Sequence, residues 1–423
     1  MHKAQRTKAM REKIYFKTFG CRTNIYDTEL LKSYVKDFEL TNDENEANII
    51  IINSCTVTNS ADSTARAYIN SLQKKGVKII LTGCGVAKQG KEFFEKKAVF
   101  GVLGAGKKQL INTLLKQNSQ FYELGELNFI DEGRLKGFQR HTKAFLKIQE
   151  GCDYACSYCI IPSVRGKSRS VSENELVKQV QEFVQNGYTE FVLTGTNIGS
   201  YGLKNGTTLG KLLQKLGAIK GVKRIRLGSL EPAQIDESFK EILDEAWIER
   251  HLHIALQHTS EKMLRLMRRR SHTKDDLALF EFLADKNFAL GTDFIVAHPG
   301  ETPEIWSEAL GNFKKFKLTH LHGFIFSPRT GTHSATLKND IKGEVAKARL
   351  RELKAIVAQN NFEFRQKQKA LNVLVESFKN GFYEGYDEFY NKIKIKSTND
   401  ISKQWLKISA YEIKEEGNEA ILS

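Results

Sequence analysis

The cysteines of this 423-residue chain can do metal chemistry, and they fall into two groups of three. One group forms a compact C-x3-C-x2-C run and consists of Cys152, Cys156 and Cys159. The other group is dispersed and consists of Cys21, Cys55 and Cys84. Thiolates select iron–sulfur clusters or zinc, and an ordinary cluster takes four of them. Two sets of three therefore predict two clusters, each with one iron open to an outside ligand.

Zinc is the competing metal for the compact run. A structural zinc ion normally needs four fixed protein ligands, and no histidine or fourth cysteine lies close to this run in the sequence. The start, Met1–Arg6, is polar, and nothing approaches an unbroken apolar run of about 18 residues. We therefore expect a cytoplasmic protein with no membrane association, where cysteines bind metals more often than they form disulfides.

The formal net charge of +15 and the pI near 9.3 suit a polyanionic partner such as RNA. Lys-rich proteins of AT-rich genomes have the same composition without binding RNA. Because net charge bears on association rather than on fold, both readings stay open at this point.

The first third of the chain alternates predicted strands and helices. Apolar runs predict strands at 13–18, 47–52, 77–81 and 98–100, and a helix is predicted near 27–36. This is the rhythm of a parallel, doubly wound α/β sheet.

The dispersed cysteines follow the first three of these strands by a few residues. Open parallel sheets bind ligands in the crevice outside the carboxyl ends of their strands. We therefore expect the three thiols to converge in space. Three unrelated core cysteines are the alternative, but it does not explain the flexible neighbours Gly20, Gly83 and Gly85.

A polar connector near 117–137 precedes a longer α/β repeat. Its strand candidates are 144–148, 190–193, 222–227, 252–256, 294–296 and 321–326. Six βα units fall short of the eight of a closed barrel, so we expect a partial (βα)6 barrel.

The last fifty or so residues alternate in the manner of half-exposed strands, at 373–376, 392–396 and 405–409. A small antiparallel barrel or sheet is expected there. The Lys–Ile alternation of 392–396 makes one cationic face, which suits RNA contact but also an edge strand protected by lysines.

The loop Gly151–Cys159, with Tyr158 before its last cysteine, resembles the cluster loop of radical S-adenosylmethionine (SAM) enzymes. The flanking Ile160–Gly166 and the upstream triad resemble the methylthiotransferase branch. The resemblance covers nearly the whole chain. It implies a methylthiotransferase N-terminal domain at 11–120, a radical SAM core at 138–367 and a TRAM-like RNA- or substrate-binding domain at 368–423.

The segments Thr18–Asn24 and Asn53–Thr58, with Ala61–Asp62, are similar to the threonylcarbamoyladenosine tRNA methylthiotransferases. That group implies conversion of N6-threonylcarbamoyladenosine at position 37, 3′ of the anticodon, to its 2-methylthio derivative. The alternatives are a methylthiotransferase for isopentenyladenosine tRNA or for a ribosomal-protein aspartate. A non-catalytic iron–sulfur protein that binds RNA or transfers electrons is the alternative of another class.

The resemblance also implies cofactors and partners. It implies two [4Fe–4S] clusters and two SAM molecules per turnover. A radical is needed because the adenine C–H that is replaced is not appreciably acidic. The compact triad would chelate SAM through its open iron, and the dispersed triad would carry the sulfur. The expected partners are the tRNA anticodon loop and a reductant such as flavodoxin or ferredoxin, and the sulfur donor is left unassigned.

Further candidate residues lie at the ends of predicted barrel strands and in a basic cluster. The SAM candidates are Gly195, Asn197, Glu231 and Gln257. The RNA-phosphate candidates are Arg265, Arg268, Arg269 and Arg270, which also suit the carboxyl end of a solvated helix. The segment Gly101–Lys108 mimics a P-loop but lacks the final Ser or Thr, so we reject nucleotide hydrolysis.

Overall fold

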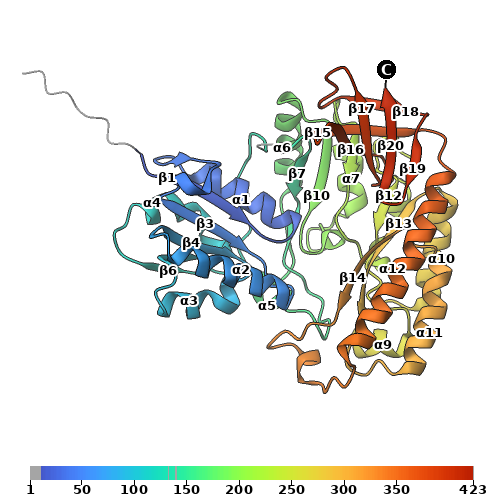
Figure 1. The fold of residues 1–423 in the computed structure, drawn as a ribbon, viewed down its shortest axis with the longest axis horizontal. Helices are drawn as coiled ribbons and strands as arrows, with labels where there is room; N and C mark the ends of the chain where they lie inside the picture. The colour runs from blue at the N-terminus through green and yellow to red at the C-terminus, as the bar shows by residue number, and fades with distance from the viewer. Residues whose placement is uncertain (1–10, 132, 139–140, 423) are drawn as a thin grey trace, which may run out of the picture. The chain divides into compact units, whose positions relative to one another are not determined.

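The computed structural model describes residues 11–131, 133–138 and 141–422 (Figure 1). The chain forms two compact units. Unit 1 comprises residues 1–135 together with 163–167, and unit 2 comprises 136–162 together with 168–423. Residues 163–167 thus pack with unit 1, although they follow the compact cysteine run in the sequence. The three-part division with boundaries near 120, 138 and 367 stays a prediction.

Unit 1 is built on a parallel sheet with the strand order β2-β1-β3-β4-β5-β6. Its strands are β1 (Lys13–Thr18), β2 (Glu39–Leu40), β3 (Ile49–Ser54), β4 (Lys78–Gly83), β5 (Gly101–Leu103) and β6 (Phe121–Glu123). The run Ile49–Ile52 in β3 is fully buried, as expected for a strand that is covered on both faces. The predicted parallel α/β sheet is confirmed.

Helices cover both faces of this sheet. They are α1 (Arg22–Tyr34), α2 (Asn59–Gln73), α3 (Lys91–Glu95) and α4 (Ile111–Leu115), and α5 (Ile161–Arg165) ends among residues of unit 1. Ile50 and Ile52 pack in one apolar cluster with Phe93, whereas Ile51 packs in another with Leu31. Alternate side chains of β3 therefore serve opposite faces, as in a doubly wound sheet.

Two predicted elements in unit 1 are displaced, and one strand was not predicted. The helix predicted near 27–36 begins at Arg22, directly after Cys21. The strand predicted at 98–100 lies at 101–103, and β6 lies inside the predicted polar connector. The last two are linked, because a Cβ on Gly101 would lie 2.3 Å from the Phe121 ring. Phe121 of β6 therefore packs directly over Gly101 of β5.

Unit 2 contains a partial barrel of parallel strands. They are β7 (Ala144–Lys147), β10 (Glu190–Thr194), β11 (Arg224–Arg226), β12 (His251–His253), β13 (Ala289–Val296) and β14 (His320–Ile325). The sheets β11-β10-β7 and β12-β13-β14 are joined by parallel bridges from Ile225 to Ile248 and from Leu230 to Ile254. The arrangement is the predicted partial (βα)6 barrel.

The barrel helices begin at well-defined caps. Side chains of Ser172, Thr208 and Thr302 accept hydrogen bonds from backbone N–H groups at three helix starts. The helices are α6 (Glu173–Gln185), α7 (Leu209–Gly217), α8 (Glu237–Lys240), α9 (Glu261–Leu266), α10 (Thr273–Asp285), α11 (Pro303–Phe313) and α12 (Gly343–Gln366). The long α12 packs along β14 (Figure 1). Among the described residues, no helix has the length and apolarity needed to cross a bilayer.

The end of the chain forms a curled β sheet with the order β18-β15-β16-β17-β20-β19. Its strands are β15 (Leu371–Lys379), β16 (Phe382–Tyr386), β17 (Lys392–Ser397), β18 (Trp405–Ile408), β19 (Glu412–Lys414) and β20 (Gly417–Leu422). In β17, Ile393 and Ile395 are buried and the three lysines that alternate with them are not, so the expected alternation is present. The β17–β20 pair is parallel, which departs from the predicted antiparallel sheet.

Two buried arginines fasten this sheet to the barrel. Arg226 donates to carboxylate oxygens of Glu190 at 2.8 Å and Glu249 at 3.1 Å, and to the backbone oxygen of Asp387 at 2.8 Å. Arg224 donates to Glu190 at 2.6 Å and to the backbone oxygen of Asn372 in β15 at 2.9 Å. Burial raises the pKa of Glu190, but the two arginines outweigh it and lower the pKa to about 2.

Replacing Arg226 with methionine is expected to lower the free energy of unfolding by about 3–5 kcal/mol, because it leaves buried carboxylates without their partner. The matched control is Lys215→Met, which removes an exposed pair with Glu173 in the same unit and should cost under about 1 kcal/mol. Denaturant unfolding of both variants measures the difference. Equal losses in the two variants would contradict the argument.

Candidate active site

The dispersed cysteines lie at the carboxyl end of the unit 1 sheet. Cys55 and Cys84 directly follow β3 and β4, and Cys21 follows β1 by three positions. In the order β2-β1-β3-β4, the chain changes direction across the sheet between β1 and β3. Such a switch point opens a crevice for ligands at the strand ends. Burial raises the pKa of the Cys55 and Cys84 thiols, and Cys21 lies close enough to raise the pKa of both further.

Glycines allow this close approach. Gly20 has φ +98°, and a Cβ there would lie 2.6 Å from Cβ of Cys55. Gly83 has φ +89°, and its Cβ would lie 2.4 Å from the backbone oxygen of Ser54. An L side chain is strained at such φ values, so these two positions accept only glycine without movement of the cysteine loops.

Arg165 adds a positive charge to the dispersed triad. Its Nε donates to Sγ of Cys84 at 3.0 Å, and its two other nitrogens donate to Asp27 at 2.9 Å and Asn24 at 2.8 Å. Burial raises the pKa of the Cys84 thiol to about 11, and Arg165 acts in the opposite direction. The guanidinium therefore favours the thiolate form that a metal ligand needs.

Asn24 and Asp27 hold this arginine from α1. The amide nitrogen of Asn24 donates to the backbone oxygens of Phe19 and Ser54, at 2.8 and 3.1 Å, so its oxygen faces Arg165. Asp27 also pairs with Lys108 at 3.3 Å. Lys108, the last residue of the P-loop-like segment, is thus buried against a carboxylate.

Replacing Arg165 with alanine is expected to destabilise the protein by about 3 kcal/mol, because it breaks a buried ion pair. It should also lower the iron retained at the dispersed triad. The matched control is Arg66→Ala, which removes an arginine pair with Glu92 that is 40% and 36% exposed and should cost under about 1 kcal/mol. Denaturant unfolding and iron analysis test both effects. Unchanged iron and stability in Arg165→Ala would contradict this role.

The compact triad lies on the loop after β7 and β8 (Gln149–Glu150) in unit 2. The loop is fastened through Ser157, whose backbone nitrogen donates to the Met267 oxygen at 3.0 Å and whose hydroxyl donates to the Leu266 oxygen at 2.9 Å. The amide nitrogen of Asn197 donates to Sγ of Cys152 at 3.6 Å. Burial raises the pKa of Cys152 and of Cys159, and the nearby Cys156 thiol raises both further, so the three thiols share one neighbourhood.

The chemistry of both triads fits an iron–sulfur cluster. Burial raises the pKa of Cys159 to about 12, and a bound metal is the partner that removes such a proton. Sulfur atoms on one zinc ion lie about 3.8 Å apart, given Zn–S bonds of about 2.3 Å. Within the described ranges, neither triad forms a three-ligand group with all donor atoms inside 4.8 Å. Three thiolates are the donor set that an iron–sulfur cluster takes when an outside ligand completes it.

The four SAM candidates are placed differently. Asn197 contacts Cys152, and its oxygen accepts from Gln234 at 2.7 Å. Gly195 lies against Gln149, where a Cβ would come within 2.7 Å of the backbone oxygen. Gln257 has φ 64° and pairs with β13 through its backbone.

Glu231 has a partner that the sequence did not suggest. It forms an ion pair with Arg269, whose Nη1 lies 2.8 Å from Oε1. The side chain of Arg269 is 2% exposed, and its Nη1 also lies 3.7 Å from Sγ of Cys156. A buried, paired guanidinium beside the triad speaks against phosphate contact through Arg269.

The other three arginines of the basic cluster are exposed, namely Arg265, Arg268 and Arg270. The Arg270 guanidinium stacks 4.2 Å from the centroid of the Tyr154 ring, which belongs to the compact cysteine loop. This segment therefore supports the triad loop as well as presenting charge to solvent. Sequence reasoning missed Arg165, Asn24 and Asp27, although Arg165 lies six positions after Cys159 in a motif that the resemblance includes.

Family models match two stretches of the chain. Residues 13–104 match a family described as uncharacterized protein family UPF0004, and residues 146–311 match the radical SAM superfamily. The partial barrel, the compact cysteine loop and this match define a radical SAM protein, which implies a [4Fe–4S] cluster and SAM as cofactors.

Relatives extend the match to nearly the whole length. A Helicobacter pylori (strain 26695) protein whose name places it among the methylthiotransferases is 48% identical, over 97% of this chain and 100% of its own. The threonylcarbamoyladenosine tRNA methylthiotransferase MtaB of Aquifex aeolicus is 32% identical, over 90% of this chain and 99% of its own. The tRNA-2-methylthio-N(6)-dimethylallyladenosine synthase of Fervidobacterium nodosum is 33% identical, over 90% and 92%.

The chain belongs to the radical SAM methylthiotransferase family and resembles its MtaB members. It is thereby a transferase of sulfur-containing groups. Among solved structures, the radical SAM methyltransferase TsrM of Kitasatospora setae aligns with a TM-score of 0.59 at 13% identity, over 77% of this chain and 74% of its own. The cobalamin-dependent radical SAM enzyme OxsB aligns with a TM-score of 0.52 at 13% identity, over 83% and 56%. These two likenesses concern the fold alone.

Proposed function

We propose that this protein methylthiolates tRNA, converting N6-threonylcarbamoyladenosine at position 37 to its 2-methylthio derivative. The carrying observation is that each unit gathers one cysteine triad at strand ends, within a family that transfers methylthio groups. The identity with Aquifex aeolicus MtaB supports the threonylcarbamoyl substrate. The motif segments Thr18–Asn24 and Asn53–Thr58 support it as well.

Cys152, Cys156 and Cys159 would hold the cluster that, when bound, supplies the electron for cleaving SAM to a 5′-deoxyadenosyl radical. Asn197 would fix Cys152 and stay close to the bound SAM, together with Gly195 and Gln257. Glu231, held by Arg269, would present a carboxylate oxygen to a SAM hydroxyl or ammonium group. The ion pair with Arg269 restricts rotation of the Glu231 carboxylate, so Glu231 is preorganised.

Cys21, Cys55 and Cys84 would hold a second [4Fe–4S] cluster that carries the transferable sulfur. Arg165 would offset the negative charge of this group and orient Cys84. The methylation of sulfur and the radical step would each consume one SAM, which makes two per turnover. A low-potential protein of the flavodoxin or ferredoxin class would supply electrons.

The tRNA would be held through its phosphates. Arg265, Arg268 and Arg270 are exposed in unit 2, and Lys394 and Lys396 flank buried isoleucines in β17. Such contacts position a polyanion without reading its sequence. The target adenine lies in a single-stranded loop, where a base is accessible without the opening of a duplex, and the cytoplasm is where this substrate occurs.

A second candidate substrate is isopentenyladenosine in tRNA, which the 33% identity with the Fervidobacterium nodosum enzyme favours. Nucleoside analysis of tRNA from a deletion strain separates the two. We expect 2-methylthio-threonylcarbamoyladenosine to disappear and its precursor to accumulate, with recovery on complementation. Loss of 2-methylthio-isopentenyladenosine with the threonylcarbamoyl nucleoside unchanged would overturn the proposal.

A further inference from the structure

Two histidines and an aspartate, none of which serves either cysteine triad in the proposed function, gather on adjacent strands of the unit 2 barrel. His253 belongs to β12, Asp293 to β13 and His322 to β14. In the sheet register, Asp293 lies directly opposite His322, and His253 lies opposite Gly291, two positions before Asp293. Since alternate residues of a strand share a face, all three side chains emerge on one face.

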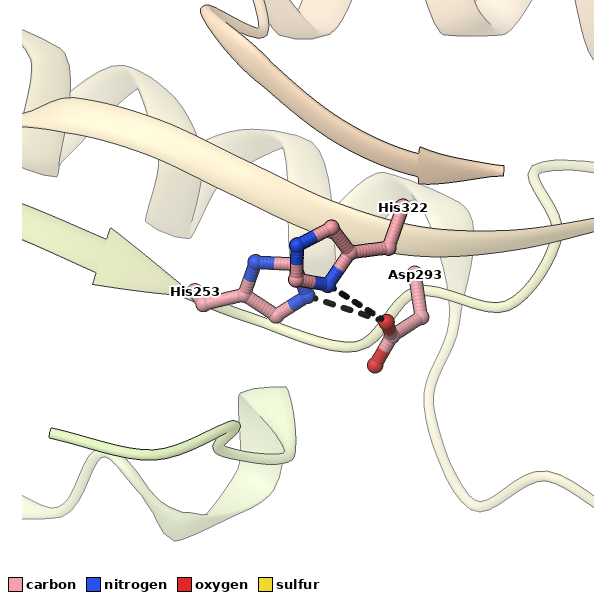
Figure 2. Close-up of side chains that lie close together, drawn as sticks. All are labelled: His253, Asp293 and His322. Carbon is pink, nitrogen blue, oxygen red and sulfur yellow. Dashed lines mark ion pairs between the residues drawn. The ribbon is translucent and has the colours of Figure 1, made fainter. Parts of the chain in front are cut away.

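Their donor atoms converge, as Figure 2 shows. Nε2 of His253 and Nδ1 of His322 lie 3.1 and 3.5 Å from the same oxygen, Oδ1 of Asp293. All three ligand atoms lie within 4.8 Å of one another. Ligands on one metal ion, with bonds of about 2.0–2.1 Å, are separated by about 2.9 Å at right angles and about 3.4 Å at tetrahedral angles. The two distances to Oδ1 of Asp293 are close to these values.

The His253 nitrogen is close to Asp293 without a well-aligned hydrogen bond. Nε2 of His253 is buried and has no hydrogen-bond partner among the described residues. A buried nitrogen normally has a partner. Because Nε2 of His253 has no hydrogen-bond partner, it is available to bind a cation that lies beside the Asp293 carboxylate.

The Asp293 carboxylate has a further contact that holds its orientation. Its other oxygen, Oδ2, accepts from the Ser229 hydroxyl at 3.3 Å, which is the kind of outer contact that orients a metal-binding carboxylate.

Room for the rings comes from Gly291. A Cβ at this position would lie 2.9 Å from Nδ1 of His253 and 3.0 Å from Nε2 of His251. The side chain of His253 is 9% exposed, that of Asp293 is 20% exposed and that of His322 is 66% exposed. The group is thus closed on the His253 side and open on the His322 side.

We propose that His253, Asp293 and His322 bind a divalent transition-metal ion of the Zn²⁺ or Fe²⁺ type. Two imidazoles and one carboxylate suit such ions, and three protein ligands leave positions open for oxygen ligands such as water or a substrate carboxylate. Ser229 is two positions before Glu231, whose partner Arg269 reaches Cys156. The ion would therefore lie on the barrel wall that continues toward the compact triad.

Zinc binding to the anaerobic holoenzyme tests the proposal. The clusters are reconstituted first, and iron is measured throughout so that exchange at cysteines is detected. Equilibrium dialysis against Zn²⁺ should give one bound zinc per chain with iron unchanged. In His322→Ala and Asp293→Asn the dissociation constant should rise at least tenfold, since each removes one ligand. His322 is largely exposed, so its replacement leaves the fold intact.

The matched control is His272→Ala, which removes an exposed histidine of unit 2 that lies beside Glu261 and should leave zinc binding unchanged. Absence of tight zinc in the wild type, or equal affinity in His322→Ala, would show that the three residues form only a charge-paired network. Loss of zinc in His272→Ala as well would indicate non-specific surface binding. Because the readout is bound zinc, it is independent of tRNA modification.

Discussion

Replacing Cys156 with alanine is expected to abolish reductive cleavage of SAM and, with it, tRNA modification. The compact loop has three thiols for a cluster that needs three protein ligands when SAM completes it. The sulfur of Cys156 also lies 3.7 Å from the buried guanidinium of Arg269. Removing the thiol leaves the loop with two ligands and leaves Arg269 facing an alanine. 5′-Deoxyadenosine formed from SAM and dithionite under anaerobic conditions measures the effect.

The control for this variant is Cys55→Ala, in which the compact triad is untouched. Iron should fall from about eight per chain to about four in both variants, as expected when one of two four-iron clusters is lost. Only Cys156→Ala should lose 5′-deoxyadenosine. Wild-type cleavage by Cys156→Ala would contradict the assignment of SAM to this loop.

Replacing Cys55 with alanine is expected to have the opposite pattern, with SAM cleavage retained and methylthiolated tRNA lost. The Cys55 thiol is buried beside Gly20 and shares its surroundings with Cys21 and Cys84. A site that carries sulfur needs this triad, whereas cleavage of SAM needs only the compact one. Alanine differs from cysteine only by the missing sulfur, so the loss of packing is small compared with the loss of a ligand.

Mass analysis of tRNA nucleosides together with 5′-deoxyadenosine from the same reaction reads out this variant. The expected result is abundant 5′-deoxyadenosine without a 2-methylthio nucleoside. Methylthiolated product in the absence of Cys55 would exclude the dispersed triad as the sulfur carrier. Loss of both products would mean that the two triads do not act separately.

The placement of the two cysteine triads at strand ends could be predicted from the sequence, because spacing and strand pattern are both local properties. The C-x3-C-x2-C run needs no knowledge of the fold. The dispersed triad follows from apolar runs such as Ile49–Ile52, since the carboxyl ends of parallel strands meet at one edge. The partial barrel follows from the same rhythm of strands and helices.

Partners that come from distant segments could not be predicted in this way. Arg165 follows the compact loop in the sequence but packs against Cys84 in unit 1. The sequence alone suggests that Arg269 is an exposed basic residue, whereas in the structure it is buried and paired with Glu231. The strand β6 was missed because a short strand with one buried Phe121 carries little periodicity.

The histidine–aspartate group did leave a signal. His251-Leu252-His253 and His320-Leu321-His322 place histidines at alternate positions of two strands. Alternation puts both histidines of each strand on one face. Asp293 lies on the strand between them. Its place beside His253 and His322 could not be predicted, because it depends on the register of β12, β13 and β14.

The most direct test of the account is the reaction itself. Purified holoenzyme is incubated anaerobically with SAM, a reductant and tRNA that carries N6-threonylcarbamoyladenosine, beside a parallel reaction on isopentenyladenosine tRNA. The account predicts 2-methylthio-threonylcarbamoyladenosine in the first reaction and no methylthiolated nucleoside in the second. Product from isopentenyladenosine tRNA alone, or 5′-deoxyadenosine without methylthiolation of either tRNA, would contradict it.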